Sequence, residues 1–160
     1  MSLNSFISTS RKIMRGDAGV DGDAQRIAQL TWLLFLKVYD AKEADWEFHN
    51  PAYQSIIPKH LRWRSWAPDR KDGRSKTGEE LLTFLNTELF PVLKSLPITA
   101  STPLSQSVVR AVFEDSNQYM KDGILIRQLV NLIDEIDFED YADRHRSEER
   151  RVGKECCLPC

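Results

Sequence analysis

Hydrophobic residues recur along the chain at intervals of three and four, the spacing of amphipathic helices, and nowhere in the sustained alternation of a strand. The first helix is predicted over residues 3–14, with Gly16 placed to end it. The second is predicted from an N-cap at Asp23 to about Glu43. Its apolar positions form one stripe, Ile27, Leu30, Leu34, Val38 and Ala41, and a second group, Trp32, Leu33, Phe35 and Leu36. Because this helix is apolar around most of its circumference, we expect it at the centre of the domain.

Residues 50–76 have weaker periodicity and several helix-breaking residues. Prolines at positions 51, 58 and 68 and a glycine at 73 predict a long loop with one or two short helical turns. Thr77 and Glu80 then have the spacing of a capping box, in which hydroxyl and carboxylate each bond a backbone N–H group. The helix that follows is expected to reach Leu96, with a kink or break at Pro91 and an end at Pro97.

Two more helices complete the predicted elements. Thr102–Pro103 opens one of them with a cap followed by a proline in the first turn, and Asp122–Gly123 precedes the other. The apolar face of the last helix contains Leu125, Leu129, Leu132, Ile133 and Ile136. The chain is therefore predicted to be all-α, an irregular bundle of about five to seven helices with a long basic loop.

The composition is that of an ordinary soluble domain. Of 160 residues, 41% are hydrophobic and 29% are charged, and the formal net charge is −2. These values exclude a polycationic tail and wholesale disorder, and the length suits a single domain. The longest apolar run, residues 32–36, is far shorter than the roughly 20 residues of a membrane-spanning helix, so no membrane association is expected.

The small net charge hides two segments of opposite sign. Residues 134–143 contain six acidic residues and no basic one. Residues 59–76 contain seven basic and two acidic residues, a local net charge of +5. The basic residues are Lys59, Arg62, Arg64, Arg70, Lys71, Arg74 and Lys76. We interpret these seven as candidates for contact with DNA phosphates, while the interleaved Trp63 and Trp66 stack or anchor a partner. Under the alternative interpretation, both tryptophans pack onto the core and the cations are simply solvated.

Motifs that resemble catalytic elements lack the context that their chemistry requires. Gly16, Gly19 and Gly22 have a phosphate-binding spacing, but no predicted strand precedes them, so a flexible connector is the preferred interpretation. Residues 50–53, Asn-Pro-Ala-Tyr, are similar to the N-P-P-[FY] motif with which amino methyltransferases hold a flipped base. Here Ala52 replaces the second proline, and a turn that ends the preceding helix is the simpler interpretation. We therefore assign no catalytic or cofactor-binding residue.

No metal site is predicted either. Asp134 and Asp137 are expected on a solvated helix end, without the burial that a catalytic carboxylate pair needs. Cys156, Cys157 and Cys160 form at most half of a zinc site, because no second pair of ligands is present.

Four blocks of the sequence, in order, resemble the start of the modification subunit of type I restriction–modification systems. They are residues 11–43, residues 78–82 with 89–91, residues 112–123 and residues 129–138. The second block contains Gly-Glu-Glu-Leu-Leu and Leu-Phe-Pro, and the third is Val-Phe-Glu-Asp-Ser-Asn-Gln-Tyr-Met-Lys-Asp-Gly. The resemblance extends over about residues 3–145 and keeps the order and spacing of the blocks.

This resemblance implies the N-terminal helical domain of an adenine-specific DNA methyltransferase subunit. In that family the domain precedes the catalytic domain, helps two modification subunits close around DNA and influences how methylation is sensed. The implied partners are DNA, held weakly and without sequence specificity, the specificity subunit, a second modification subunit and the restriction subunit, in a prokaryotic cytoplasm. The alternative is a protein-docking module that makes no direct contact with DNA.

The resemblance also implies S-adenosylmethionine as the cofactor of the full-length parent. The glycine-rich cofactor loop and the N-P-P-F motif of the family's catalytic domain are not found in these 160 residues. We therefore expect no cofactor in this chain and no activity from it alone.

Residues 147–160 do not continue the family pattern. Family members pass from a Tyr-x-x-Arg-His-like stretch, matched by residues 141–145, into the methyltransferase domain, whereas residues 147–160 look like a segment appended to unrelated sequences. We therefore predict a helical domain over residues 1–146 and a non-native tail over residues 147–160. The 146-residue part contains no cysteine, which suits a reducing cytoplasm.

Overall fold

A computed structural model describes residues 2–138 of the chain, and within this range every regular element is helical. The longer helices are α1 (Leu3–Arg15), α2 (Gly22–His49), α6 (Leu104–Glu114) and α7 (Gly123–Asp134). Shorter elements lie between α2 and α6: η1 (Lys59–Leu61), α3 (Trp63–Trp66), α4 (Gly78–Phe84), η2 (Leu85–Leu89) and α5 (Phe90–Lys94). The all-α prediction is confirmed. Residues 139–160, which include the predicted tail and the three cysteines, lie outside the described range.

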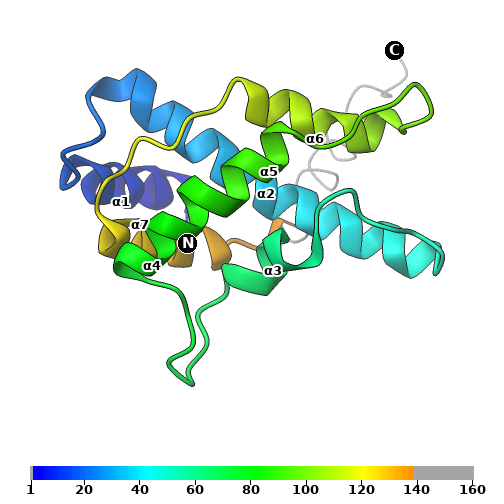
Figure 1. Ribbon diagram of the computed structural model, residues 1–160. Helices are drawn as coiled ribbons and strands as arrows, with labels where there is room; N and C mark the ends of the chain where they lie inside the picture. The colour runs from blue at the N-terminus through cyan, green and yellow to red at the C-terminus, as the bar shows by residue number, and fades with distance from the viewer. Residues whose placement is uncertain (1, 139–160) are drawn as a thin grey trace, which may run out of the picture.

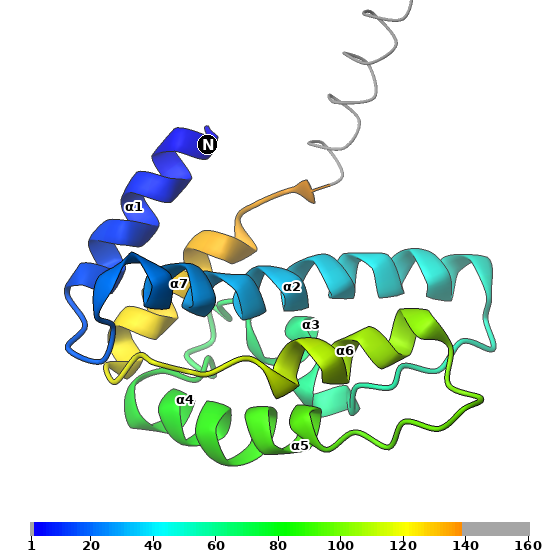
Figure 2. The same cartoon turned by 90° about the horizontal axis from the view of Figure 1, so that it is seen from above.

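The helices are arranged around α2, which runs the length of the domain (Figure 2). The run from α4 to α5 crosses the direction of α2 in Figure 1, and α6 packs against α5. Trp32 of α2 is fully buried and contacts Phe90 of α5, with 4.9 Å between ring centroids. Phe90 in turn contacts Phe113 of α6 at 5.3 Å. These aromatic contacts confirm the central position predicted for this helix.

The buried face of α2 differs from the stripe that comes first in the sequence pattern. Trp32, Leu33 and Leu36 are at most 1% exposed, whereas in the stripe Ile27 is 63% exposed and Leu30 and Leu34 are only partly buried against the core. The bounds differ as well, because Asp21 rather than Asp23 is the N-cap, and the helix continues past Glu43 to His49. Asp23 lies inside the first turn, and the backbone N–H of Asp21 donates to the Gln25 side chain at 2.7 Å.

The predicted capping box at Thr77 does not form. No side-chain hydrogen bond caps α4 at Thr77, and Glu80 instead faces Lys76 at 3.4 Å. Gly78 adopts a φ of +58°, so the backbone turns in a way that does not place the hydroxyl over the third residue of the helix. The predicted kink at Pro91 takes the form of the π-helical segment η2 immediately before α5.

The two later helices begin close to the predicted positions. Asp122 caps α7 as its carboxylate accepts the backbone N–H groups of Ile124 and Leu125, at 2.9 and 3.1 Å. In α6 the N-cap is Pro103, one residue later than predicted, because the Thr102 hydroxyl accepts the backbone N–H of Thr99 instead.

Helices α4 and α7 begin in direct backbone contact. A Cβ atom added to Gly123 would lie 1.9 Å from the carbonyl oxygen of Gly78, 2.3 Å from its carbonyl carbon and 2.6 Å from its Cα. Only a residue without a side chain allows the two helix starts to approach this closely. The base of the loop that precedes α4 is thereby held against α7.

The connector between α1 and α2 is also fixed in place. Asp17, 4% exposed, accepts the backbone N–H groups of Gly19, Lys121 and Asp122 at 2.7, 3.0 and 2.8 Å. The glycine-containing segment is therefore a connector, as predicted, but it is tied to the chain just before α7 rather than free.

Candidate nucleic-acid interface

The basic segment of the sequence forms a loop that projects from the body between α3 and α4 (Figure 1). Elements η1 and α3 are the two short helical turns expected at its start. At its tip Gly73 turns the backbone with a φ of +75°, and the Ser75 hydroxyl donates to Asp69 at 2.8 Å. The loop is therefore closed across its own width by short-range hydrogen bonds.

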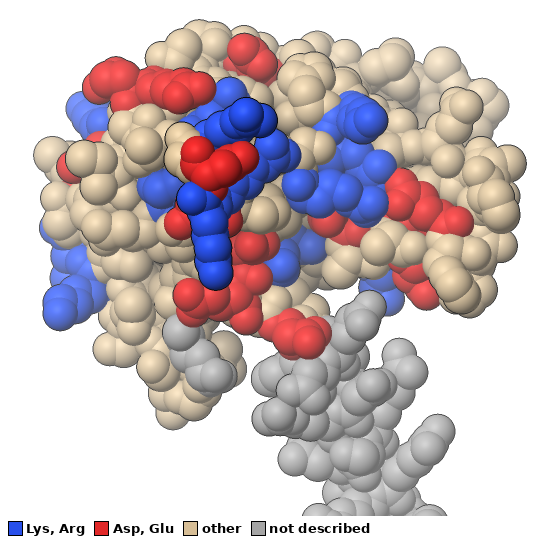
Figure 3. Space-filling view, turned by 90° about the horizontal axis from the view of Figure 1, so that it is seen from below, with Lys and Arg blue, Asp and Glu red and all other residues tan. Residues whose placement is uncertain are grey.

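Besides Arg64, four of the predicted contact residues are exposed: Lys59, Arg70, Lys71 and Arg74. Within residues 2–138 no ion pair is found for Lys59, Arg70 or Lys71, and Arg74, with 79% of its side chain exposed, faces Asp72 at 3.6 Å. Figure 3 looks onto the projecting loop and shows separate clusters of basic residues with acidic residues beside them. The loop thus offers cations that no acidic side chain of the described chain fully neutralises.

Lys76 is less available than these four. Its side chain is 35% exposed, faces Glu80 at 3.4 Å and lies over the Phe84 ring at 5.3 Å from the centroid. It is held at the base of the loop.

Arg62 and Arg64 are held by the acidic face of α2. Arg62, with a side chain 13% exposed, contacts Glu47 at 2.7 Å and Glu43 at 3.6 Å. Arg64 contacts Asp40 at 2.8 Å and the other Glu47 oxygen at 2.9 Å. The ion pair with Arg62 and then the hydrogen bond from Arg64 hold the pKa of Glu47 below its ordinary value. These two cations therefore fasten the start of the loop to α2.

Trp63 and Trp66 lie in the core, at 2% and 4% exposure. The Trp63 indole N–H donates to Asp134 of α7 at 2.8 Å, and that of Trp66 donates to the Leu61 carbonyl at 3.1 Å. The two rings also contact each other, with centroids 5.3 Å apart. Their burial matches the interpretation in which the tryptophans pack onto the core.

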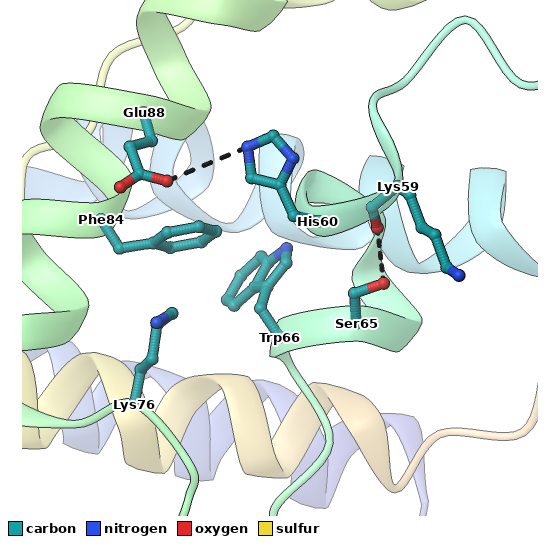
Figure 4. Close-up of a pocket in the computed structure, with 7 residues that line it drawn as sticks. All are labelled: Lys59, His60, Ser65, Trp66, Lys76, Phe84 and Glu88. Atoms are coloured by element: carbon teal, nitrogen blue, oxygen red, sulfur yellow. Dashed lines mark hydrogen bonds and ion pairs between the residues drawn. The ribbon is translucent and has the colours of Figure 1, made fainter.

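A hollow of about 500 Å³ opens beside the base of the loop (Figure 4). Its lining comes from η1, α3, the end of the basic loop, α4 and η2: Lys59, His60, Ser65, Trp66, Lys76, Phe84 and Glu88. His60 faces Glu88 across it at 4.0 Å. Sequence reasoning missed His60, Phe84 and Glu88 because these residues meet only after the chain has folded.

The motifs that resemble catalytic elements have structural roles. Asn50 ends α2 and its side chain accepts the backbone N–H of Ala52 at 3.1 Å, so the segment is the helix-ending turn that the sequence favoured. The Tyr53 hydroxyl donates to buried Glu43 at 2.8 Å, and burial with this bond raises the pKa of Tyr53 to about 12.

Asp134 differs from its predicted place on a solvated helix end. Its side chain is 27% exposed and is paired with Lys37 at 3.1 Å, in addition to accepting the Trp63 indole N–H. The carboxylate therefore joins α7 to α2 and α3. In the part of the chain that the structure covers, residues 2–138, no cluster of three or more possible metal-ligating side chains occurs. In the same range no helix is long and apolar enough to span a bilayer.

Comparison with known proteins identifies the family of this fold. Residues 3–133 match the family described as the HsdM N-terminal domain. A relative, the type I restriction enzyme EcoEI methylase subunit of Escherichia coli, is 46% identical over 145 residues, which make up 91% of this chain and 29% of the relative.

Two solved structures share the fold. One, described as a modification subunit of a type I restriction enzyme from Vibrio vulnificus YJ016, matches with a TM-score of 0.75 and 30% identity, over 95% of this chain and 34% of that one. Another, from a structure that addresses complex assembly and conformational transition of the type I R-M system, gives a TM-score of 0.69 and 30% identity, over 86% and 26%. The chain thus spans about a quarter to a third of the length of these proteins. Since the family match covers most of the chain, the protein belongs to the HsdM N-terminal domain family of type I restriction–modification methylase subunits.

Proposed function

We propose that this domain serves subunit association and DNA clamping in a type I modification enzyme, and that the exposed cations of the loop approach DNA phosphates. The observation that carries the proposal is the loop itself, which projects from the body with Arg70, Lys71 and Arg74 at its tip. Lys59 lies beside its base. Such contacts position a protein on DNA without reading the base sequence.

The remaining cations have a supporting part in this proposal. Arg62 and Arg64 already contact three carboxylates of α2, so we assign them to bracing the loop rather than to DNA. Lys76 lies at the loop base, and Trp63 and Trp66 form the packed platform beneath. A substitution of Arg62 or Arg64 would therefore disturb the loop through its attachment and would not report on a phosphate contact.

The wider setting of the domain is also proposed from its family. The partners would be the specificity subunit, a second modification subunit and the restriction subunit, in a prokaryotic cytoplasm. S-adenosylmethionine would be bound by the catalytic part of the parent subunit. The specificity subunit would choose the DNA sequence, which agrees with a loop suited to phosphates rather than to base edges.

The salt dependence of DNA binding tests the loop. We would compare the chain with a triple variant, Arg70→Gln, Lys71→Gln and Arg74→Gln, by fluorescence anisotropy on a labelled duplex over a range of salt concentrations. Each lost phosphate contact lowers the slope of log affinity against log salt by about 0.9, so the slope should fall by roughly 2–3. The same variant in a complete modification enzyme should weaken DNA binding in the same direction.

A charge-matched control separates the loop from net charge. Arg11→Gln, Lys12→Gln and Arg15→Gln remove three exposed cations from α1 and should leave the slope almost unchanged. If both triple variants change the slope equally, or neither does, the loop is not the DNA contact.

A docking function without DNA contact is the second candidate. Two large apolar side chains support it, because Phe48 at the end of α2 is 84% exposed and Leu104 at the start of α6 is 85% exposed. Under this function, Phe48→Ser with Leu104→Ser would weaken assembly of the modification complex, and DNA binding by the chain would be absent at low salt.

A further inference from the structure

Arg127 of α7 contacts both ends of the basic loop. Its Nη2 donates to the carbonyl of Ala67, where the loop leaves α3, and its Nη1 donates to the carbonyl of Lys76, just before α4, at 3.3 Å. Its Nε donates to the Asn131 side chain, one turn further along α7, at 2.9 Å. One side chain from a distant part of the sequence therefore joins the two points between which the loop is suspended.

The guanidinium is buried, its hydrogen bonds go to neutral oxygens, and the Asp69 and Asp134 carboxylates favour its charge only from beyond ion-pair distance. Arg127 is 7% exposed, and no carboxylate of residues 2–138 lies within ion-pair distance of it. Burying a cation is costly unless its N–H groups are satisfied, and here neutral oxygens satisfy them. The planar fork suits this task because it donates in several fixed directions at once, which a lysine ammonium does not do.

The contacts also limit the freedom of the loop. If Arg127 did not connect residues 67 and 76, the loop between them could adopt many backbone conformations. Holding the two ends together lowers the conformational entropy of the loop. Asp134 adds a second fixed point on α7 through its hydrogen bond with Trp63. Helix α7 thereby holds α3, the loop base and the start of α4 in one arrangement.

We propose that Arg127 is the positioning residue of the basic loop, closing its base so that Arg70, Lys71 and Arg74 are presented together to DNA. The part of this inference that concerns DNA rests on the proposed function. The part that concerns loop closure does not, and it can be measured without DNA.

Limited trypsin digestion measures loop closure, because Arg70, Lys71 and Arg74 are themselves trypsin sites. Arg127→Met removes every donor while keeping an unbranched, apolar side chain. We expect cleavage at these three sites to become at least about tenfold faster, the ratio that corresponds to losing one hydrogen bond from a charged donor. Arg127→Lys keeps the charge and should give an intermediate rate. Gln128→Ala, at an exposed neighbouring position of α7, should leave the rate unchanged.

DNA binding tests whether Arg127 positions the loop cations. With all loop cations still present, Arg127→Met should weaken duplex binding and lower the salt slope in the direction of the loop triple variant. Circular dichroism establishes that each variant is folded, and Arg127→Lys supplies both readouts if Arg127→Met does not fold. The lysine variant should then still show faster loop cleavage and weaker DNA binding than the unchanged chain.

The outcomes separate the two proposals. A folded Arg127 variant with unchanged cleavage at the loop overturns the inference. Faster cleavage with unchanged DNA binding overturns the positioning role, provided that the loop triple variant does weaken binding. If the loop triple variant leaves DNA binding unchanged, the proposed function fails, and the positioning of cations toward DNA fails with it.

Discussion

The contact between Gly78 and Gly123 predicts a large effect from one added methyl group. In Gly123→Ala the new Cβ would have to move from 1.9 Å to beyond 3.0 Å from the Gly78 carbonyl oxygen, so the starts of α4 and α7 must separate by about 1 Å. All three atoms in the way belong to the backbone, which cannot rotate aside. Overpacking of this kind costs about 1–3 kcal/mol, and the unfolded-state advantage of alanine returns less than about 1 kcal/mol.

We therefore expect Gly123→Ala to lower the free energy of unfolding by about 2 kcal/mol, or Tm by roughly 4–8 °C for a domain of this size. Urea denaturation followed by tryptophan fluorescence measures the change. Gly16→Ala is the matched control, because its φ is −73° and the nearest atoms to a new Cβ are 3.3 Å away. If Gly123→Ala unfolds at the same urea concentration as the unchanged chain, the backbone contact is refuted. If Gly123→Ala and Gly16→Ala lose the same free energy of unfolding, the effect is not specific to the contact with Gly78.

Three further substitutions test the polar contacts of the core. Trp63→Phe removes the indole N–H that bonds Asp134 at 2.8 Å and should cost about 2 kcal/mol in urea denaturation; a loss below about 0.5 kcal/mol would contradict this bond. Asp17→Ala leaves several backbone N–H groups without their acceptor and should cost about 3 kcal/mol by the same measurement, whereas a loss typical of a surface aspartate would contradict it. Glu47 has a lowered pKa in the folded state, so its contacts with Arg62 stabilise the protein above pH 4.5 and are lost progressively as the pH falls below that value. Tm should consequently fall less on acidification in Glu47→Gln than in the unchanged chain, and parallel Tm curves would count against the pair.

Helical periodicity was enough to predict the fold class and most helix positions, because amphipathic spacing reports which residues can be buried together. It could not decide which apolar residues of α2 are buried most deeply, since both the Ile27 stripe and the Trp32 group are apolar. Only packing against α5 and α6 makes that choice. The capping-box prediction at Thr77 was wrong for a local reason, the positive φ of Gly78.

The basic loop could be located from the sequence, but the sequence could not show which of its cations pair with carboxylates and which stay exposed. Arg62 and Arg70 have the same side chain and lie in the same charged segment, yet only Arg62 folds against carboxylates contributed by another helix. Such pairing depends on contacts between distant residues. The role of Arg127 also depends on contacts between distant residues. A single arginine in an apolar helix does not indicate which two carbonyls it will join.

The meeting of α4 and α7 has an electrostatic consequence. Each helix start carries a partial positive charge from its unpaired N–H groups, so two starts in contact repel one another. Negative side chains offset this repulsion: Asp122 caps α7, and Glu79 and Glu80 lie in the first turn of α4. Two blocks that the sequence separates, Gly-Glu-Glu-Leu-Leu and Lys-Asp-Gly, are therefore one junction in space. Chimaeras between relatives should exchange both blocks together, since each supplies the room and the charge that the other needs.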